Sequence, residues 1–278
     1  MRHLALALSL AALPLAPLLV SQEATAADKP DIRLLVGSVE SGRIAAGLAI
    51  DLPEGWKTYW RTPGDAGMPP VFDASTSRGL GPIGVRFPAP ERFDEAGLTA
   101  IGYTGSVVLP LDVALANPEA PGLLSITVMV GLCHEICVPF ETRVEAEIPP
   151  NRAVDATARA AIDAAQARVP GPAEATSPHV TMVHREIGSV GPRLVAAVAM
   201  PPEGEGRRDV LVEGPGPEWS LPQPERIGRH GTDELWAFDL DGVPKGADLS
   251  AVDLRFTLTA GDRAVEQIVR VDVRPPAP

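Results

Sequence analysis

The sequence predicts an all-β fold with two β-sandwich domains joined by a short helical linker, and three observations support this. The chain is rich in proline (30) and glycine (26), which favour turns over long helices. Its apolar residues alternate over short segments that are separated by turn-forming residues, as is typical of strands. Its 278 residues also exceed the roughly 100 that one sandwich needs.

The first 26 residues have the layout of a secretory signal peptide. Arg2 and His3 precede an apolar run over residues 4–20, and the small residues Ala24 and Ala26 provide an A-x-A cleavage site. Two prolines interrupt the run, which weakens the alternative of a membrane anchor. We therefore expect cleavage after Ala26, a periplasmic protein without a retained membrane span, and oxidising surroundings for its cysteines.

Charge and motifs exclude several classes of function. The net charge is −12 and no cluster of Lys or Arg forms a basic patch, so nucleic acid is not an expected partner. A nucleophile elbow, a phosphate-binding loop, a dinucleotide fingerprint and an H-E-x-x-H motif are all missing from the sequence. The sequence therefore gives no basis for a hydrolase, kinase or dehydrogenase, and we expect no cofactor.

The first domain is expected to span residues 27–150, after the signal peptide of residues 1–26. Its predicted strands are IRLLVGSVE (32–40), RIAAGLAIDL (43–52), SVVLPLDVAL (106–115), LSITVMVGL (124–132) and VPFETRVEAEI (138–148). Two Gly/Pro-rich connections are expected between them, RTPGDAGMPP (61–70) and FPAPERFDEAG (87–97).

Residues 151–177 are expected to form the linker. This stretch is rich in alanine up to Pro170, which predicts one helix with Asn151 as its N-cap. Strand patterns then return and predict a second sandwich over residues 178–278, without cysteine. Its predicted strands are VTMVHREI (180–187), RLVAAVAM (193–200), RDVLVEG (208–214), ELWAFDL (234–240), VDLRFTL (252–258) and AVEQIVRVDV (264–273).

The only two cysteines, Cys133 and Cys137, lie in GLCHEICVPFE (131–141). Apolar residues occupy the even positions on both sides of this pair, so the even side chains should face the core and the odd cysteines should face away from it. An extended chain would hold the two Cα atoms roughly 13 Å apart, whereas a disulfide needs about 4.4–6.8 Å. A hairpin with residues 134–136 as its loop would pair the cysteines on one face and allow the disulfide expected after export.

Three uses of this pair remain open. As a structural staple, the disulfide would contribute only about 2 kcal/mol, because the loop that it closes is short. A metal site would use Cys133, His134 and Cys137, with Met129 as a further ligand. The sequence has no second Cys or His cluster to complete a usual set of four, so no metal is expected. A redox role is favoured, because exposed disulfides over tight turns are readily reduced.

Three motifs in the first half of the chain resemble the periplasmic N-terminal domain of the thiol:disulfide interchange protein DsbD and its ScsB-type relatives. They are GWKTYWRTPGDAG (55–67), FPAPERFDEAGLTAIGYTGSVVLPL (87–111) and the hairpin GLCHEICVP (131–139). The resemblance covers less than half of the chain, and its specificity lies in the order of the motifs.

The resemblance implies an immunoglobulin-like fold in which Cys133 and Cys137 carry out thiol–disulfide interchange, a protein-disulfide reductase activity. Electrons would come from a membrane-embedded thiol carrier and pass to periplasmic thioredoxin-fold proteins, with Cys137 forming the mixed disulfide. Such domains serve in cytochrome c biogenesis and copper tolerance. The alternative is a non-enzymatic periplasmic binding or assembly module, for example in copper handling, with a structural disulfide.

The sequence departs from the family pattern in two places. The family's cysteines are usually separated by five residues, and here by three. DsbD also shields its cysteines with a cap loop of Asp-Glu-Phe-Tyr, where this chain has Asp94, Glu95, Ala96 and Gly97. Phe93 or Leu98 would have to replace the missing aromatic pair.

Other side chains are expected beside the cysteines. Tyr59 has the opposite parity to Trp60 and should face away from the core, and Tyr103 and His134 are further candidates. Asp94 and Glu95 would oppose a thiolate by like charge, although solvated loop acids are the commoner case.

Overall fold

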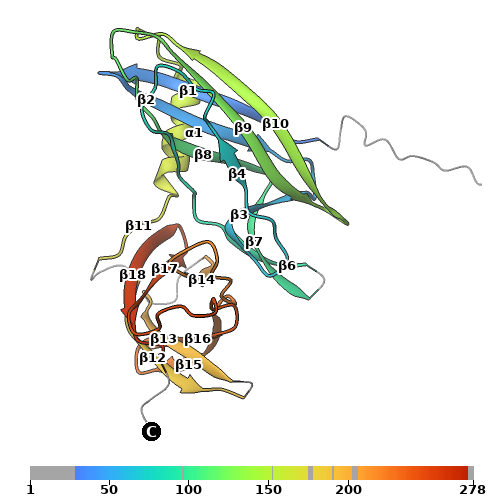
Figure 1. Cartoon of the computed structure of the whole chain (residues 1–278), viewed down its shortest axis with the longest axis vertical. Coiled ribbons are helices and arrows are strands. Elements are labelled where there is room, and N and C mark those ends of the chain that lie inside the picture. Colours follow the sequence, from blue (N-terminus) through green and yellow to red (C-terminus); the bar gives the residue numbers. More distant parts are fainter. Residues whose placement is uncertain are drawn as a thin grey trace, which may run out of the picture.

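The structure, a computed structural model, describes residues 29–95, 97–151, 153–174, 178–189, 191–201 and 206–274. The predicted signal peptide (1–26) lies outside these residues. The described strands form four sheets in two sandwiches, and the chain between the sandwiches contains one helix. This confirms the predicted fold class, and Figure 1 shows the two sandwiches one above the other.

The first sandwich packs a four-stranded sheet, in the order β1-β2-β8-β5, against a six-stranded sheet, β10-β9-β3-β7-β6, in which β4 also pairs with β9. The strands are β1 Asp31–Glu40, β2 Arg43–Asp51, β3 Lys57–Gly64, β4 Val71–Asp73, β5 Gly84–Val85, β6 Glu91–Glu95, β7 Leu98–Thr104, β8 Ser106–Asp112, β9 Gly122–Cys133 and β10 Cys137–Ile148.

Strand β9 shows how the alternating pattern builds the core. Its even-numbered residues Ile126, Val128 and Val130 are at most 1% exposed and pack between the two sheets. Burying each such side chain stabilises the fold by roughly 1.5–3 kcal/mol. The predicted even-inward parity of this strand is confirmed.

Two segments that were predicted as connections contain strands. Residues 61–64 belong to β3, and part of the segment 87–97 forms β6, an edge strand that pairs with β7. An edge strand has one open side, where charged residues discourage pairing with other chains. The charged sequence of β6 follows from this position and concealed the strand from a search for alternating apolar residues.

The helix α1, Ala156–Ala167, begins later than predicted. Asp155 is the N-cap in place of Asn151, and its side chain accepts hydrogen bonds from the N–H groups of Thr157 (3.1 Å) and Ala158 (3.0 Å). The buried face of α1, which includes Ile162, packs on β1, β2 and β8. The helix thus covers the outer face of the four-stranded sheet. No helix in the described part of the chain has the length and hydrophobicity needed to cross a membrane.

The second sandwich pairs the sheet β11-β18-β17-β14 with the sheet β12-β13-β16-β15. The strands are β11 Gly171–Pro172, β12 His179–Ile187, β13 Pro192–Ala199, β14 Arg208–Glu213, β15 Glu225–His230, β16 Asp233–Asp239, β17 Val252–Ala260 and β18 Arg263–Val271. The six predicted strands are present. The edge strand β15 was not predicted, because most of its side chains are exposed and charged.

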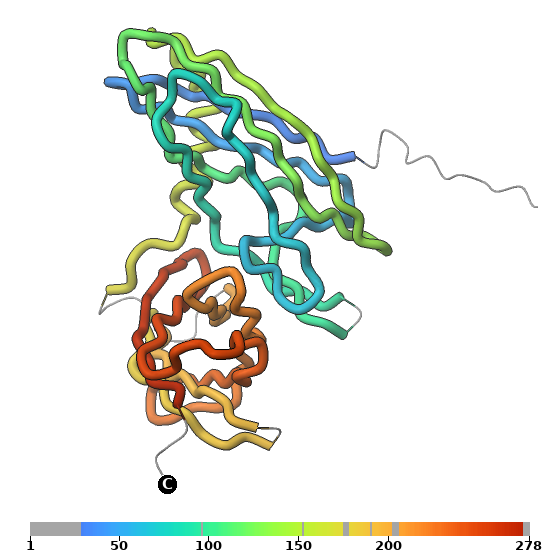
Figure 2. Tube along the Cα trace, viewed as in Figure 1, coloured from blue at the N-terminus to red at the C-terminus, as the bar shows by residue number. Residues whose placement is uncertain are grey.

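Charged side chains join the two sandwiches, and Figure 2 shows the chain segments that meet there. Arg61 of β3 donates hydrogen bonds to Glu213 (2.9 and 2.7 Å) and to Glu266 (2.5 Å). Arg92 of β6 binds both carboxylate oxygens of Asp209, at 3.0 and 2.8 Å. Such two-pronged guanidinium–carboxylate pairs fix orientation as well as distance.

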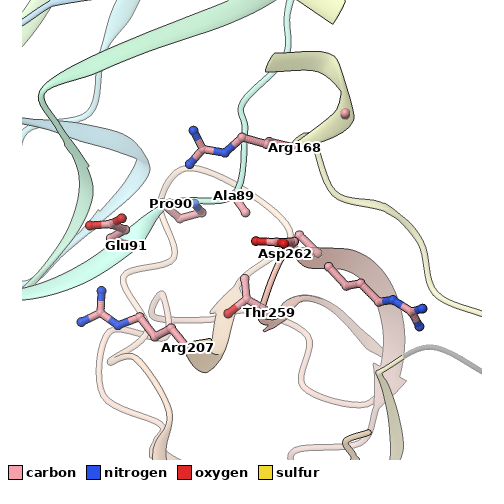
Figure 3. A pocket seen from close by; sticks show the side chains of 11 residues that line it. Ala89, Pro90, Glu91, Arg168, Arg207, Thr259 and Asp262 are labelled. Carbon is pink, nitrogen blue, oxygen red and sulfur yellow. The ribbon is translucent and has the colours of Figure 1, made fainter. Parts of the chain in front are cut away.

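A pocket of about 530 Å³ lies beside this junction (Figure 3). It opens between residues 89–91, the end of α1 and the β17–β18 turn. Its charged lining residues have both signs: Glu91, Arg168, Arg207, Asp262 and Arg263. This mixture of charges does not indicate one class of charged ligand for the pocket.

Candidate functional site

The β9–β10 hairpin brings the two cysteines together. Cys133 and Cys137 are directly paired in its register, and their Cα atoms are 4.1 Å apart. Residues 134–136 form the loop, in which the N–H of His134 donates to the carbonyl of Ile136 at 3.3 Å. The two sulfurs form a disulfide. The predicted hairpin and its three-residue loop are confirmed.

The two sulfurs differ in accessibility. Cys137 is exposed, whereas Cys133 is 4% exposed and packs with Tyr59 and Ala100 in a small apolar cluster beside the main core. Both side chains face away from the main core, as their parity predicted. The expectation that Cys133 lies open on the outer face is wrong, because this cluster, with Phe93 at its edge, covers it.

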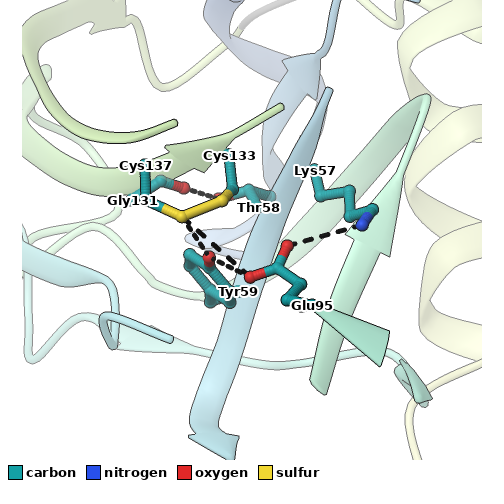
Figure 4. Close-up of a disulfide and its surroundings, with 7 residues drawn as sticks. All are labelled: Lys57, Thr58, Tyr59, Glu95, Gly131, Cys133 and Cys137. Carbon is teal, nitrogen blue, oxygen red and sulfur yellow. Dashed lines mark hydrogen bonds and ion pairs between the residues drawn. A yellow bond between two sulfur atoms is a disulfide. The ribbon is translucent and has the colours of Figure 1, made fainter. Parts of the chain in front are cut away.

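Tyr59 and Glu95 lie against the exposed sulfur (Figure 4). The Tyr59 hydroxyl is 3.3 Å from Sγ of Cys137 and donates to Oε2 of Glu95 at 2.9 Å. Oε2 of Glu95 is itself 4.0 Å from the same Sγ. Burial, followed by the hydrogen bond to Glu95, raises the pKa of Tyr59 far above its usual range, so the phenol stays protonated and acts as a donor.

Lys57 completes this group and was missed by the sequence reasoning. Its Nζ lies 3.4 Å from Oε1 of Glu95 and 4.8 Å from the centre of the Phe93 ring. Lys57 is also the register partner of Cys133 across β3 and β9. Its parity, shared with Tyr59, was the signal that could have identified it.

The other predicted neighbours lie apart from the sulfurs. Asp94 is exposed and accepts a hydrogen bond from the N–H of Gly97 (3.1 Å), which closes the β6–β7 turn. Tyr103 is 5% exposed in the main core and donates to the carbonyl of Pro88 at 2.8 Å. His134 stacks on Trp56 with their ring centres 5.7 Å apart.

The side chains around the disulfide include one group of possible metal ligands. Glu95, Cys133 and Cys137 offer ligand atoms that lie within 4.8 Å of one another. Among the described residues no His belongs to this group, so the set that the sequence suggested, with His134, is not brought together. Three donors fall short of the four that structural zinc prefers, and the sulfurs are held in a disulfide.

Comparison with protein families matches the part of the chain that contains this site. Residues 29–149 match the family model described as thiol:disulfide interchange protein DsbD, N-terminal. Residues 29–149 are therefore similar to a DsbD-type N-terminal domain. The predicted resemblance is therefore confirmed for the part of the chain that holds both cysteines.

Solved structures extend the likeness in fold beyond the DsbD-type domain. The N-terminal periplasmic domain of ScsB from Proteus mirabilis matches with a TM-score of 0.66 and 19% identity, over 87% of this chain and 92% of that one. The N-terminal domain of Neisseria meningitidis DsbD, in its reduced form, matches at 15% identity over 44% of this chain and 86% of that one. Its TM-score of 0.28 is too low to support a structural argument. A search of curated proteins finds no significant match.

Proposed function

We propose that this chain is a periplasmic thiol–disulfide exchange protein that relays electrons through Cys133 and Cys137. It would receive them from a membrane-embedded thiol carrier and pass them to thioredoxin-fold proteins. The observation that carries the proposal is that the two paired cysteines differ in exposure. Cys137 is exposed, whereas Cys133 is buried, and their Cα atoms are 4.1 Å apart. A relay needs one sulfur for a partner to reach and a second one to release that partner.

The exchange transfers two electrons from the Cys133/Cys137 dithiol to a disulfide of the partner. In the reduced chain, the Cys137 thiolate attacks a disulfide of the partner, forms a mixed disulfide and expels one partner thiolate. The Cys133 thiolate then attacks Sγ of Cys137 and expels the second partner sulfur as a thiolate. This chain ends with the Cys133–Cys137 disulfide, and the partner leaves as a dithiol after taking up two protons.

Tyr59 and Glu95 would position and tune the attacking sulfur. The Glu95 carboxylate at 4.0 Å opposes negative charge on Sγ of Cys137, whereas the Tyr59 hydroxyl at 3.3 Å can donate to that charge if it gives up its hydrogen bond to Glu95. Lys57 offsets part of the Glu95 charge at 3.4 Å. Glu95 and Tyr59 would therefore act on a Cys137 thiolate in opposite directions.

The proposal divides the chain into parts with different roles. Residues 1–26 would direct export and be removed, and residues 27–150 would carry the exchange site. Residues 151–177 would link this domain to the second domain, residues 178–278, which would serve as a docking or spacer module. The ion pairs of Arg61 and Arg92 support a fixed orientation of the second domain.

Trapping in cells tests the relay. A Cys133→Ser variant lacks the resolving sulfur, so Cys137 should accumulate as a mixed disulfide that mass spectrometry identifies with a thioredoxin-fold protein. Cys137→Ser should accumulate far less adduct, because Cys133 is 4% exposed, and the double variant should accumulate none. Failure of Cys133→Ser to capture any thioredoxin-fold protein would contradict the relay.

A second candidate rests on the cluster of Glu95, Cys133 and Cys137. In a binding or assembly module, the disulfide would be structural, or its reduced form would hold a soft cation such as Cu(I). Thiol labelling in cells separates the two candidates, because the relay requires a partly reduced pair and a structural disulfide stays fully oxidised. Titrating the reduced protein with Cu(I) tests the metal directly.

A further inference from the structure

Exposed apolar side chains gather around the accessible sulfur. Ile136, in the loop between the cysteines, is 70% exposed, and Leu98, at the start of β7, is 50% exposed. Leu98 is the register partner of Glu95, and directly paired residues of antiparallel strands point to the same face. Because Glu95 points at Cys137, Leu98 projects on that side too. Pro139, exposed and of the same parity as Cys137, continues the apolar surface along β10.

Acidic side chains lie beside this apolar surface. Glu135 is exposed in the hairpin loop, and Glu141 lies next to Pro139 on the same face of β10.

Basic side chains offset little of this charge. Lys57, the nearest lysine, is engaged with Glu95, and the first Arg on this face of β10 is Arg143, six residues beyond Cys137. Exposed carboxylates around an apolar centre attract a surface of opposite charge and repel an acidic one.

We propose that the surface of Leu98, Ile136 and Pro139, with its acidic neighbours Glu135 and Glu141, is the docking face for the soluble exchange partner. This inference rests on the proposed function and specifies the partner's chemistry. The partner is a thioredoxin-fold protein whose active-site thiol lies in an apolar surface ringed by Lys or Arg. The apolar centre excludes water from the reacting sulfurs, and the acidic neighbours increase the rate of encounter.

Exchange kinetics test the docking face. The probes are two reduced thioredoxins that differ only in having lysines or glutamates around the active site, with dithiothreitol as a small reference reductant. At about 0.01 M salt, where charges act over about 30 Å, the basic probe should reduce the Cys133–Cys137 disulfide at least tenfold faster than the acidic one. At about 1 M salt, where the range falls to about 3 Å, the difference should vanish.

Matched variants separate the two parts of the surface. Ile136→Ser and Leu98→Ser should each slow the basic probe roughly fivefold to tenfold at both salt concentrations, since about 1–1.4 kcal/mol of apolar contact is lost. Glu135→Gln with Glu141→Gln should slow it by a similar factor at low salt alone. The controls are Ile187→Ser, 73% exposed on the second sandwich, and the exposed Glu119→Gln, which should change nothing.

The outcomes distinguish this inference from the proposed function. Rates with dithiothreitol should stay within twofold in every variant, because the chemistry of the sulfurs is unchanged. If thioredoxins exchange rapidly but the surface variants and salt have no effect, the docking face is wrong and the relay stands. If neither thioredoxin reacts faster than dithiothreitol at equal thiol concentration, the relay fails and the docking face fails with it.

Discussion

Each sandwich contains a buried carboxylate, and the two differ in their neighbours. Glu234 in the second sandwich has a side chain 2% exposed, with Arg208 at 2.8 Å and Arg226 at 3.4 Å. Glu95 in the first has a side chain 11% exposed, with one lysine at 3.4 Å, a neutral phenol at 2.9 Å and a disulfide sulfur at 4.0 Å. Two guanidinium groups offset the charge of Glu234, whereas Glu95 has a single lysine and lies beside the disulfide.

This difference teaches that burial alone does not mark a functional acid. A carboxylate balanced by two close cations contributes to the fold, because its field is cancelled within a few ångströms. A carboxylate with one distant cation projects negative potential onto its remaining neighbour, here Sγ of Cys137. The same residue type therefore stabilises one sandwich and, in the proposed relay, would tune the chemistry of the other.

The largest expected effect separates the two acids directly. Glu234→Gln leaves the partly buried Arg208 without its counter-charge, which should lower the free energy of unfolding by about 3–5 kcal/mol. Glu95→Gln should cost about 1 kcal/mol, because an amide oxygen can still accept from Tyr59. Urea unfolding followed by circular dichroism measures both, and equal losses would contradict the distinction.

The two cores, by contrast, should respond alike. Leu48 and Leu258 are both 0% exposed, one in each core, so Leu48→Ala and Leu258→Ala should each lower the free energy of unfolding by about 2–5 kcal/mol. Hydrogen exchange by mass spectrometry should place the greater loss of protection in the mutated sandwich. Equal loss in both sandwiches for either variant would show that they unfold as one unit.

The junction should give a smaller effect. Arg61→Gln leaves Glu213 with the Thr62 hydroxyl but without its counter-charge, which should cost about 1–3 kcal/mol and increase exchange of the β14 amides. Arg86→Gln is the matched control, since its pair with Asp112 is exposed and should contribute less than about 1 kcal/mol. A loss for Arg61→Gln no larger than for this control would mean that the junction does not hold the sandwiches together.

The smallest effect concerns alkaline pH and the first sandwich alone. Burial raises the pKa of Tyr103, so above about pH 10 the unfolded chain loses this proton first. The stabilising contribution is complete below that pH and should fall by about 1.4 kcal/mol per pH unit above it. Tyr103→Phe should make the decline shallower in unfolding measured between about pH 9 and 11. An unchanged slope would contradict the assignment.

The sequence predicted strands with a clear alternation of apolar residues and missed strands without it, among them the inner strands β3 and β7. β9 follows the two-residue period, whereas β6 and β15 are edge strands rich in charged residues, which resemble turns in a linear pattern. The helix start shifted from Asn151 to Asp155, because both residues can cap and only packing on β1 and β8 selects between them. The capping preference of the two residues alone therefore could not identify the helix start.

The site was predictable in part for the same reason. Parity placed Tyr59 on the outer face, and the hairpin follows from the distance that a disulfide can span. The burial of Cys133 was not predictable, since it depends on packing by Phe93 and Ala100 from other strands. The approach of Glu95 depends likewise on β6, a strand that was not expected.

Three consecutive residues of β3 serve three different parts of the molecule. Tyr59 contacts the disulfide, Trp60 is 0% exposed in the core, and Arg61 reaches the second sandwich. Inserting or deleting one residue here would move all three side chains to wrong positions at once, since neighbouring positions in a strand face opposite sides. The length of this strand should therefore be far more constrained than that of the loop over residues 65–70, and the spacing from disulfide to junction is set by one short stretch of chain.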